Sequence, residues 1–237
     1  MWLAVARGPN HLLRLESGRT RAQMLDHLLT LGPRIVIGLD FAFSFPSWYL
    51  DQLRVDSAPA LWSHVAQHGE RWLQECAPPF WGRPGHRRPV HFEHFRRTEH
   101  ALRRRGLSPK SVFQIGGAGA VGTGSIRGMP LLQALRARGA SIWPFDPPGW
   151  PRVVEIYPRL LTGPVVKSSA AARQAYLDRH LPAFQHAVPS EDAFDAAVSA
   201  LTMARHAADL ESLLGEPDFE LRREGRIWYP NWRADLT

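Results

Sequence analysis

The order of apolar and polar residues predicts a chain that alternates strands and helices. Two short apolar runs, 2–6 and 12–15, flank a Gly-Pro-Asn turn, which predicts a β-hairpin. Thr20 followed by Gln23 is a capping-box pattern, and apolar residues at helical spacing then continue as far as Gly32. We therefore expect a helix directly after the hairpin.

The stretch 34–40 holds a continuous apolar run rich in β-branched side chains, which is typical of a strand buried on both faces. This strand would carry Asp40 at its carboxyl end. The pattern predicts further strands at 111–115, 141–145 and 153–157, and helices at 59–74, 130–138 and 191–206. Strands that alternate with helices indicate an α/β fold.

The length of 237 residues, with 44% hydrophobic content, suits one decorated domain better than two. We expect this domain over residues 1–210, with 47–110 as an insertion rich in Trp, Pro and Arg, and 211–237 as a C-terminal tail. The single Cys76 excludes an intrachain disulfide, and no segment approaches the length of a membrane span. We therefore expect a reduced, cytoplasmic protein.

The net charge of +7, with a sequence pI near 10.4, is typical of a protein with an anionic partner such as nucleic acid. All but two of the 29 basic residues other than His are arginines, and the chain is also rich in Ala, Gly, Pro and Trp. Coding bias is therefore an alternative cause of the basicity, and composition alone leaves both causes open.

Acidic residues stand in apolar surroundings at separate places in the chain, where a charge is unusual without a partner. Asp40 ends a buried strand, Glu155 lies within a second strand, and Asp192 and Asp195 share one face of a helix. Clustered carboxylates of this kind hold the Mg²⁺ or Mn²⁺ ions that assist phosphodiester hydrolysis. The structural alternatives are that Asp40 caps a turn and that the helical acids stabilise a helix N-terminus.

A basic stripe lies on a helix expected at 93–105, on one broad face that could follow a phosphate backbone. Its residues are Arg96, Arg97, His100, Arg103 and Arg104. The alternative is a solvated helix face on which Glu99 is a local ion-pair partner. The net basicity of the chain adds weight to the binding interpretation, but both interpretations stay open.

A glycine-rich stretch at 116–124 offers backbone N–H groups and small side chains that could approach a phosphate. It lacks the Gly-Lys-Ser/Thr ending of a P-loop, and no acidic residue follows at the position typical of a dinucleotide site. We therefore prefer a structural turn. The histidines near Cys76 do not form the paired pattern of a zinc site.

Three segments taken together resemble a known family: IGLDFAFSFP at 37–46, VEIYP at 154–158 and SEDAFDAA at 190–197. The family is an uncharacterised bacterial domain-of-unknown-function family, described as predicted nucleases with a ribonuclease-H-like fold. The similarity runs from the first residues to about His206. Each motif alone is weakly specific, but their order along the chain is considerably more so.

The resemblance implies a ribonuclease-H-like mixed sheet flanked by helices, and two-metal phosphodiester chemistry with Mg²⁺ or Mn²⁺. By that analogy, Lys167 and Arg96 would contact phosphates. The acids that would act in catalysis and hold the metal are Asp40, Glu155, Asp192 and Asp195.

One departure from the family pattern affects the expected activity. Proteins of this fold begin with a strand that carries a first Asp, whereas no acidic residue precedes Glu16 here. We therefore expect that the first strand is missing. Either the true start lies upstream, or the protein lacks one metal ligand and is weakened or inactive as a nuclease.

The leading hypothesis is a divalent-metal-dependent nuclease in which the insertion supplies contacts to nucleic acid. A second hypothesis is a non-catalytic nucleic-acid-binding module on the same fold. A third is a phosphotransferase, because sugar-kinase and actin-like folds elaborate the same sheet and the loop at 116–124 could hold a nucleotide.

Overall fold

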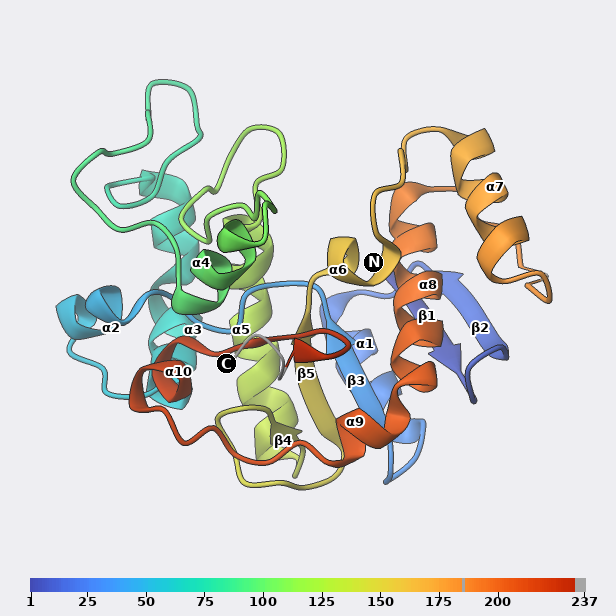
Figure 1. The fold of residues 1–237 in the computed structure, drawn as a ribbon. Coiled ribbons are helices and arrows are strands. Elements are labelled where there is room, and N and C mark those ends of the chain that lie inside the picture. Colours follow the sequence, from blue (N-terminus) through green and yellow to red (C-terminus); the bar gives the residue numbers. More distant parts are fainter. Residues whose placement is uncertain (185, 233–237) are drawn as a thin grey trace. The chain divides into compact units, whose positions relative to one another are not determined.

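The computed structural model describes residues 1–184 and 186–232 as a mixed α/β protein (Figure 1). Its ten described helices are α1 (Arg21–Thr30), α2 (Ser47–Leu53), α3 (Ala58–Glu75), α4 (Arg97–Arg104), α5 (Gly122–Ala137), α6 (Pro158–Thr162), α7 (Ala170–His180), α8 (Glu191–Arg205), α9 (Ala207–Glu211) and α10 (Phe219–Glu224). The strands are β1 (Trp2–Ala6), β2 (Leu12–Ser17), β3 (Val36–Leu39), β4 (Ser141–Ile142), β5 (Arg152–Ile156) and β6 (Ile227–Trp228). None of the described helices is both long and apolar enough to cross a bilayer.

The chain divides into two compact units, and each is assembled from segments that are distant in sequence. The first unit contains Met1–Thr30, Ile156–Leu213 and the described residues from Trp228 onward. The second unit contains Leu31–Glu155 and Leu214–Ile227. Residues that we expected to form an insertion therefore belong to the same unit as strands β3 and β4.

The first unit packs a helix against a hairpin. Strands β1 and β2 pair antiparallel, which confirms the hairpin predicted at its N-terminal end. The apolar side of α8, with Phe194 and Leu201, joins one buried cluster with Leu12 of β2. The helix begins where the sequence predicts, because the Ser190 hydroxyl accepts the N–H of Ala193 and caps its first turn.

The second unit is built on parallel strands. Strand β5 lies between β3 and β4 and pairs in parallel with both, while β6 also pairs with β5. Every residue of β5 is buried, as expected for a central strand of a parallel sheet. Helices α3 and α5 lie side by side next to this sheet (Figure 1).

Two predicted strands are much shorter than expected. Within 111–115, residues 112–113 form a turn, in which the Ser111 hydroxyl accepts the N–H of Phe113, and Gln114 forms an isolated parallel bridge with Trp81. The strand predicted at 141–145 ends at Ile142, where the chain turns back. Both predictions were therefore wrong in extent.

Two predicted helices have other bounds. The helix expected at 130–138 is α5, which begins at Gly122 and carries Pro130 in its interior. The basic helix expected at 93–105 is the shorter α4. The first correction matters for function, since the last three residues of the glycine-rich stretch, 122–124, form the first turn of a helix.

Part of the predicted C-terminal tail has regular structure. Helix α10 and strand β6 both lie within residues 211–237, and β6 pairs with β5. Residues 214–227 belong to the second unit, where Arg223 and Glu224 are buried. Residues 233–237 of that tail lie outside the described residues.

Candidate functional site

The carboxyl end of β3 presents Asp40 at the edge of the parallel sheet. Leu39 lies opposite Glu155 in the parallel pairing of β3 and β5, so Asp40 follows directly beyond that pair. The Asp40 residue is exposed, whereas Glu155 is buried. The structure therefore brings these two predicted acids to one edge of the sheet, which is where ligands bind in many α/β folds.

Both oxygens of the Glu155 carboxylate already have partners inside the protein. The Arg96 guanidinium donates to Oε2 at 2.9 Å and to Oε1 at 2.5 Å, and the Phe43 backbone N–H donates to Oε2 at 2.9 Å. The carboxylate therefore fixes the backbone of the segment that follows Asp40. Charge-assisted bonds of this kind are among the strongest in proteins, which makes Glu155 part of the scaffold.

Arg96 is fully buried, so it does not lie on the exposed basic face on which the sequence placed it. Its guanidinium also bonds to the carboxylate of Glu99 and donates to the backbone carbonyl of Glu224 at 3.0 Å. Burial by itself would lower the pKa of Arg96, but Glu155 and Glu99 hold it above its ordinary value. Arg96 is therefore an internal ion-pair partner and not a surface contact for phosphate, because a buried arginine needs carboxylates around it.

The buried network contains more carboxylates than cations. Burial raises the pKa of Glu99, while the Arg96 guanidinium acts in the opposite direction. Glu224 accepts the backbone N–H groups of Ser47 at 2.7 Å and Arg97 at 2.6 Å. The network therefore joins β5, α2, α4 and α10 of the second unit.

The acids predicted on a helix lie in the first unit, at the start of α8. Asp192 is exposed, while Asp195 is partly buried and accepts a hydrogen bond from Lys167 Nζ at 2.5 Å. Burial raises the pKa of Asp195, and the Lys167 ammonium opposes that rise. Two residues that the sequence assigned separately, one to metal and one to phosphate, are thus paired with each other.

The predicted metal ligands fit a cation poorly as they are arranged within each unit. Both carboxylate oxygens of Glu155 accept hydrogen bonds from Arg96, and one carboxylate oxygen of Asp195 accepts a hydrogen bond from Lys167. Over residues 1–184 and 186–232, no three His, Cys, Asp or Glu side chains are grouped as cation ligands. Asp40 and Asp192 are the exposed acids of the predicted set, and they belong to different units.

The basicity of the chain is concentrated in one segment. Residues 83–110, called the basic segment below, hold nine of the 29 Lys and Arg residues and two of the 22 Asp and Glu residues. Their net charge of +7 equals that of the whole chain, since the other 209 residues carry 20 charges of each sign. Coding bias alone would spread arginines over the whole sequence.

The basic segment places almost all of its cations on the surface. Eight of its nine Lys and Arg residues are exposed, and the exception is Arg96. No hydrogen bond or ion pair occupies the side chains of Arg83, Arg87, Arg104 or Lys110 within the described part of the chain. These groups are therefore available to an anionic partner.

The remaining predicted contacts of the stripe are partly engaged. Arg97 lies 3.2 Å from Asp218, and His100 lies 3.2 Å from Glu93. Both pairs are well exposed, and exposed pairs of this kind contribute at most about 1 kcal/mol. An incoming phosphate could therefore replace these carboxylates.

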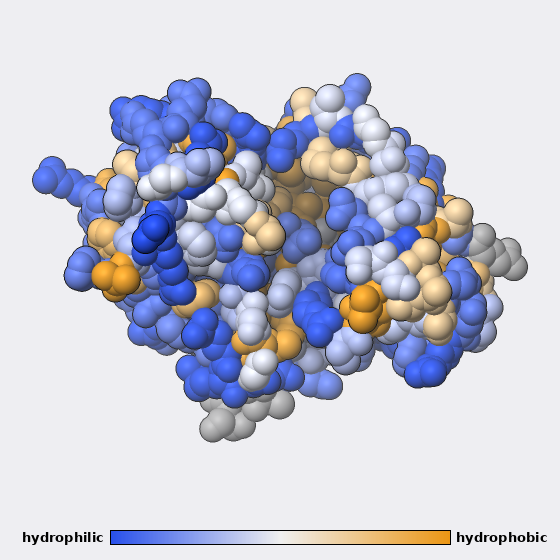
Figure 2. Space-filling view, turned by 90° about the horizontal axis from the view of Figure 1, so that it is seen from above, coloured by the Kyte–Doolittle hydropathy of each residue, from blue (hydrophilic) through white to orange (hydrophobic). Residues whose placement is uncertain are grey.

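Two arginines of the basic segment converge on one aromatic ring. The Arg103 guanidinium lies 4.5 Å from the centre of the Phe95 ring, and that of Arg88 lies 5.5 Å from the same centre. The loop around Arg88 and helix α4 therefore form one continuous surface. This side of the second unit, viewed from above, is mostly hydrophilic (Figure 2).

The glycine-rich loop lies against the basic segment. A Cβ on Gly116 would fall 2.6 Å from the carbonyl oxygen of Gly82, so two backbones meet where neither residue has a side chain. The side chain of Lys110 lies against Gly119, and α5 begins at Gly122. The glycine-rich loop therefore lies next to the two ends of the basic segment, whereas these contacts do not reach the stripe predicted on 93–105.

Sequence reasoning missed the loop that precedes α4. Arg83, Arg87 and Arg88 lie in the expected insertion at 47–110, and the run RPGHRRP at 83–89 marks them. Charge counted in windows along the chain would have found this loop.

Comparison with family models, with curated proteins and with solved structures finds no match for the chain.

Proposed function

We propose that this protein binds nucleic acid through the exposed surface of the basic segment. The observation that carries the proposal is the concentration of the entire net charge of +7 in residues 83–110, with eight of nine cations exposed. A polyanion with regularly spaced charges neutralises such a surface better than a small anion does.

The residue types favour a phosphate backbone over an acidic protein. Arginine donates two parallel hydrogen bonds to a phosphate and stacks on aromatic faces. The guanidinium groups of Arg88 and Arg103 already make cation–π contacts with the Phe95 ring, which favour these positions of the two side chains. A base or a phosphate can then bind without a large entropic cost at these side chains.

Salt-dependent binding tests the proposal. Labelled single-stranded DNA, duplex DNA and RNA are titrated with the full chain, and fluorescence anisotropy gives Kd between about 50 and 200 mM salt. One variant replaces Arg83, Arg87 and Arg104 by Gln. A matched variant makes the same change at three exposed arginines of the first unit, Arg14, Arg21 and Arg179.

The slope of log K against log salt concentration should fall by about 2–3 in the basic-segment variant, because each lost phosphate contact removes roughly 0.7–0.9. The matched variant should keep the wild-type slope. Equal losses in both variants would mean that net charge alone attracts the polyanion. No binding by the wild-type protein would end the proposal.

We propose metal-dependent phosphodiester cleavage on a ribonuclease-H-like fold as a second candidate. The specific observation in its favour is Asp40, which is exposed at the carboxyl end of a parallel strand. Ser125 of α5 accepts the N–H of Ala42, so the segment after Asp40 is tied to the helix that follows the glycine-rich loop. Asp40 and the glycine-rich loop would then lie at the same end of the parallel strands.

Cleavage of labelled DNA and RNA, with and without Mg²⁺ or Mn²⁺, tests this second candidate. Replacing Asp40 by Asn should abolish cation-dependent cleavage, while Asp56→Asn, at another exposed acid of the second unit, should not. Wild-type turnover in Asp40→Asn removes that residue from the reaction. Salt-sensitive binding without turnover supports binding alone.

A further inference from the structure

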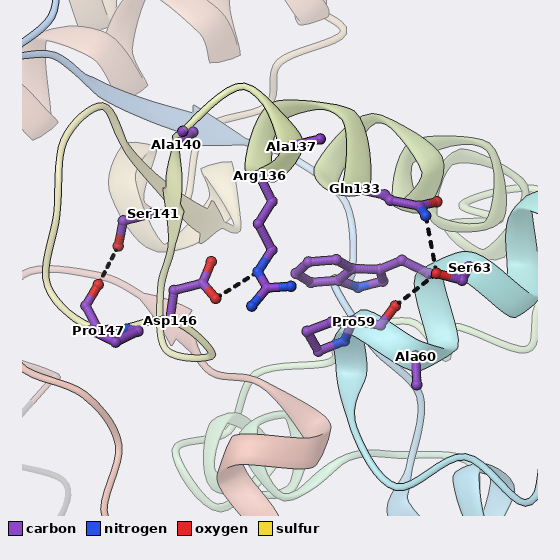
Figure 3. Close-up of a pocket in the computed structure, with 12 residues that line it drawn as sticks. Pro59, Ala60, Ser63, Gln133, Arg136, Ala137, Ala140, Ser141, Asp146 and Pro147 are labelled. Carbon is purple, nitrogen blue, oxygen red and sulfur yellow. Dashed lines mark hydrogen bonds and ion pairs between the residues drawn. The ribbon is translucent and has the colours of Figure 1, made fainter.

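A cavity of about 720 Å³ opens in the second unit, apart from the basic segment (Figure 3). It is lined by the N-terminal turn of α3, the C-terminal turn of α5 and the loop around Asp146. This volume lies within the range of about 300–1,000 Å³ that is typical of small-molecule sites. Its walls combine small apolar side chains with a few polar groups.

The cavity is lined by Arg136, whose guanidinium is bound to the described residues through Nε alone. Arg136 Nε donates to Asp146 Oδ1 at 2.7 Å, and Asp146 Oδ2 accepts the backbone N–H of Ile142 at 3.0 Å. The two terminal nitrogens of Arg136 have no hydrogen-bond partner among the described residues, and Figure 3 shows them in the space between Asp146 and Pro59. A guanidinium held in this way presents its two terminal NH₂ groups to a ligand.

The other polar groups in the cavity are largely satisfied. Ser63 accepts from Gln133 Nε2 at 3.0 Å and donates to the Pro59 carbonyl oxygen at 3.3 Å, and Ser141 donates to the Pro147 carbonyl oxygen at 2.7 Å. The amide oxygen of Gln133 keeps its capacity to accept. The cavity therefore offers donors for an anion and one acceptor for a hydroxyl group.

The two helix ends around the cavity act on an anion in opposite directions. The N-terminal end of α3 carries the positive end of its helix dipole, although Pro59 supplies no N–H there. At the C-terminal end of α5, the carbonyl oxygens of Leu135 and Arg136 accept the N–H groups of Ala140 and Gly139. These carbonyl oxygens therefore do not repel an anion as strongly as free ones.

From these contacts we infer that the cavity binds the phosphate monoester of a small polyhydroxylated molecule. The phosphate lies on the terminal nitrogens of Arg136, and a hydroxyl group donates to the amide oxygen of Gln133. The carbon skeleton lies against Pro59, Ala60 and Ala137.

This cavity is separate from the edge that carries Asp40. The first residue of β4, Ser141, lines the cavity, whereas Asp40 follows the last residue of β3. Both strands run parallel to β5, so the start of β4 and the end of β3 lie at opposite ends of the parallel strands. The ligand therefore occupies a second site, which is independent of the proposed nucleic-acid surface.

Isothermal titration of the full chain tests the inference with three probes: ribose 5-phosphate, ribose and inorganic phosphate. Arg136→Gln removes the anion contact. Ala137→Trp places a large side chain at an exposed position of the cavity wall and leaves the ion pair of Arg136 with Asp146 in place. The matched control is Arg127→Gln on the same helix, where Arg127 Nε also lies 2.7 Å from a carboxylate, that of Glu70.

Ribose 5-phosphate should bind the wild type and the Arg127→Gln control equally, and about ten- to a hundredfold more weakly after Arg136→Gln, as expected for a lost charge-assisted bond. Ala137→Trp should weaken binding to a similar degree, and ribose should bind weakly or not at all. Inorganic phosphate should bind more weakly than ribose 5-phosphate, because it lacks the hydroxyl contacts. Absence of ribose 5-phosphate binding to the wild type, equal binding of ribose, or unchanged binding in Arg136→Gln would each overturn the inference.

Discussion

Arg96 shows at the scale of single residues how a charge can hold a fold together. Its guanidinium is fully buried and bonds to the carboxylates of Glu155 and Glu99 and to the backbone of Glu224. Removing one partner of such a group leaves the opposite charges without compensation in a medium of low polarity. The sequence indicates that Arg96 carries charge, but only the fold shows that this charge is internal.

Arg96→Met should therefore destabilise the protein strongly. We expect a loss of about 3–5 kcal/mol in the free energy of unfolding at neutral pH, measured by urea denaturation, because two buried carboxylates lose their cation. Arg97→Met is the matched control on the next residue, where the exposed pair with Asp218 should contribute at most about 1 kcal/mol. A similar small loss in both variants would show that the network contributes little to stability.

Asp195 makes a second prediction at this scale, through its pKa. Burial raises the pKa of this carboxyl in the folded protein above its value in the unfolded chain, which is about 3.9. The folded state then binds more protons than the unfolded state, so the contribution of Asp195 to stability is present at low pH and is lost as pH rises through the folded pKa.

Asp195→Asn removes this pH dependence. The free energy of unfolding of the variant, relative to that of the wild type, should therefore increase as pH rises from about 4, and denaturant unfolding over a pH series measures it. Asp192→Asn, at the exposed acid one turn away on α8, removes one of the like charges that raise the pKa of Asp195, so it should change the free energy of unfolding with pH in the same direction but less. A decrease with pH would mean that the attraction of Lys167 outweighs burial.

Helix α5 shows at the scale of elements what a sequence pattern can and cannot predict. Elements with a complete local signal were predicted well: the Thr20 hydroxyl and the Gln23 side chain form the expected reciprocal cap of α1, and Ser190 caps α8. The start of α5 was missed because Pro130 is typical of the first turn of a helix. The true start at Gly122 is set by close contact with the segment that contains Val112.

That contact makes two neighbouring glycines of α5 behave in opposite ways. A Cβ at Gly122 would lie 2.3 Å from the carbonyl oxygen of Val112, which is backbone and cannot move aside cheaply. A Cβ at Gly124 would meet nothing within 4 Å. The first glycine is therefore required by close approach, and the second only adds conformational entropy to the unfolded chain.

Alanine at each position separates these roles. Gly122→Ala should lower the free energy of unfolding by about 1–3 kcal/mol through overpacking, while Gly124→Ala should raise it by roughly 0.5–1 kcal/mol through helix propensity. Thermal and urea denaturation of the two variants measure both changes. Stabilisation by Gly122→Ala would contradict the close approach of α5 to the segment that contains Val112.

At the scale of the whole molecule, charge distribution was more informative than acidic motifs. The predicted acids fall in two units: Asp40 and Glu155 in one, and Asp192 and Asp195 in the other. Their partners Arg96 and Lys167 are distant in sequence, so no pattern along the chain could reveal them. The clustering of cations in residues 83–110 is, by contrast, a property of the sequence itself.

We expect the location of these charges to affect binding to a cation exchanger more than the net charge does. Replacing Arg83, Arg87 and Arg104 by Glu lowers the net charge from +7 to +1, and the same change at Arg14, Arg21 and Arg179 lowers it equally. Because screening limits the reach of a charge to about 10 Å at 0.1 M salt, a cation exchanger senses the densest local patch more than the total charge.

The variant with Glu at positions 83, 87 and 104 should therefore elute from a sulfonate column at clearly lower salt concentration than the variant with Glu at 14, 21 and 179. Both are compared at neutral pH and have equal net charge. Circular dichroism of both variants checks that the fold is retained. Elution of the two variants at the same salt concentration would show that the exposed cations of residues 83–110 do not act as one surface. The localisation of charge could then no longer support a nucleic-acid partner, since a phosphate backbone binds a continuous patch and not a distant sum.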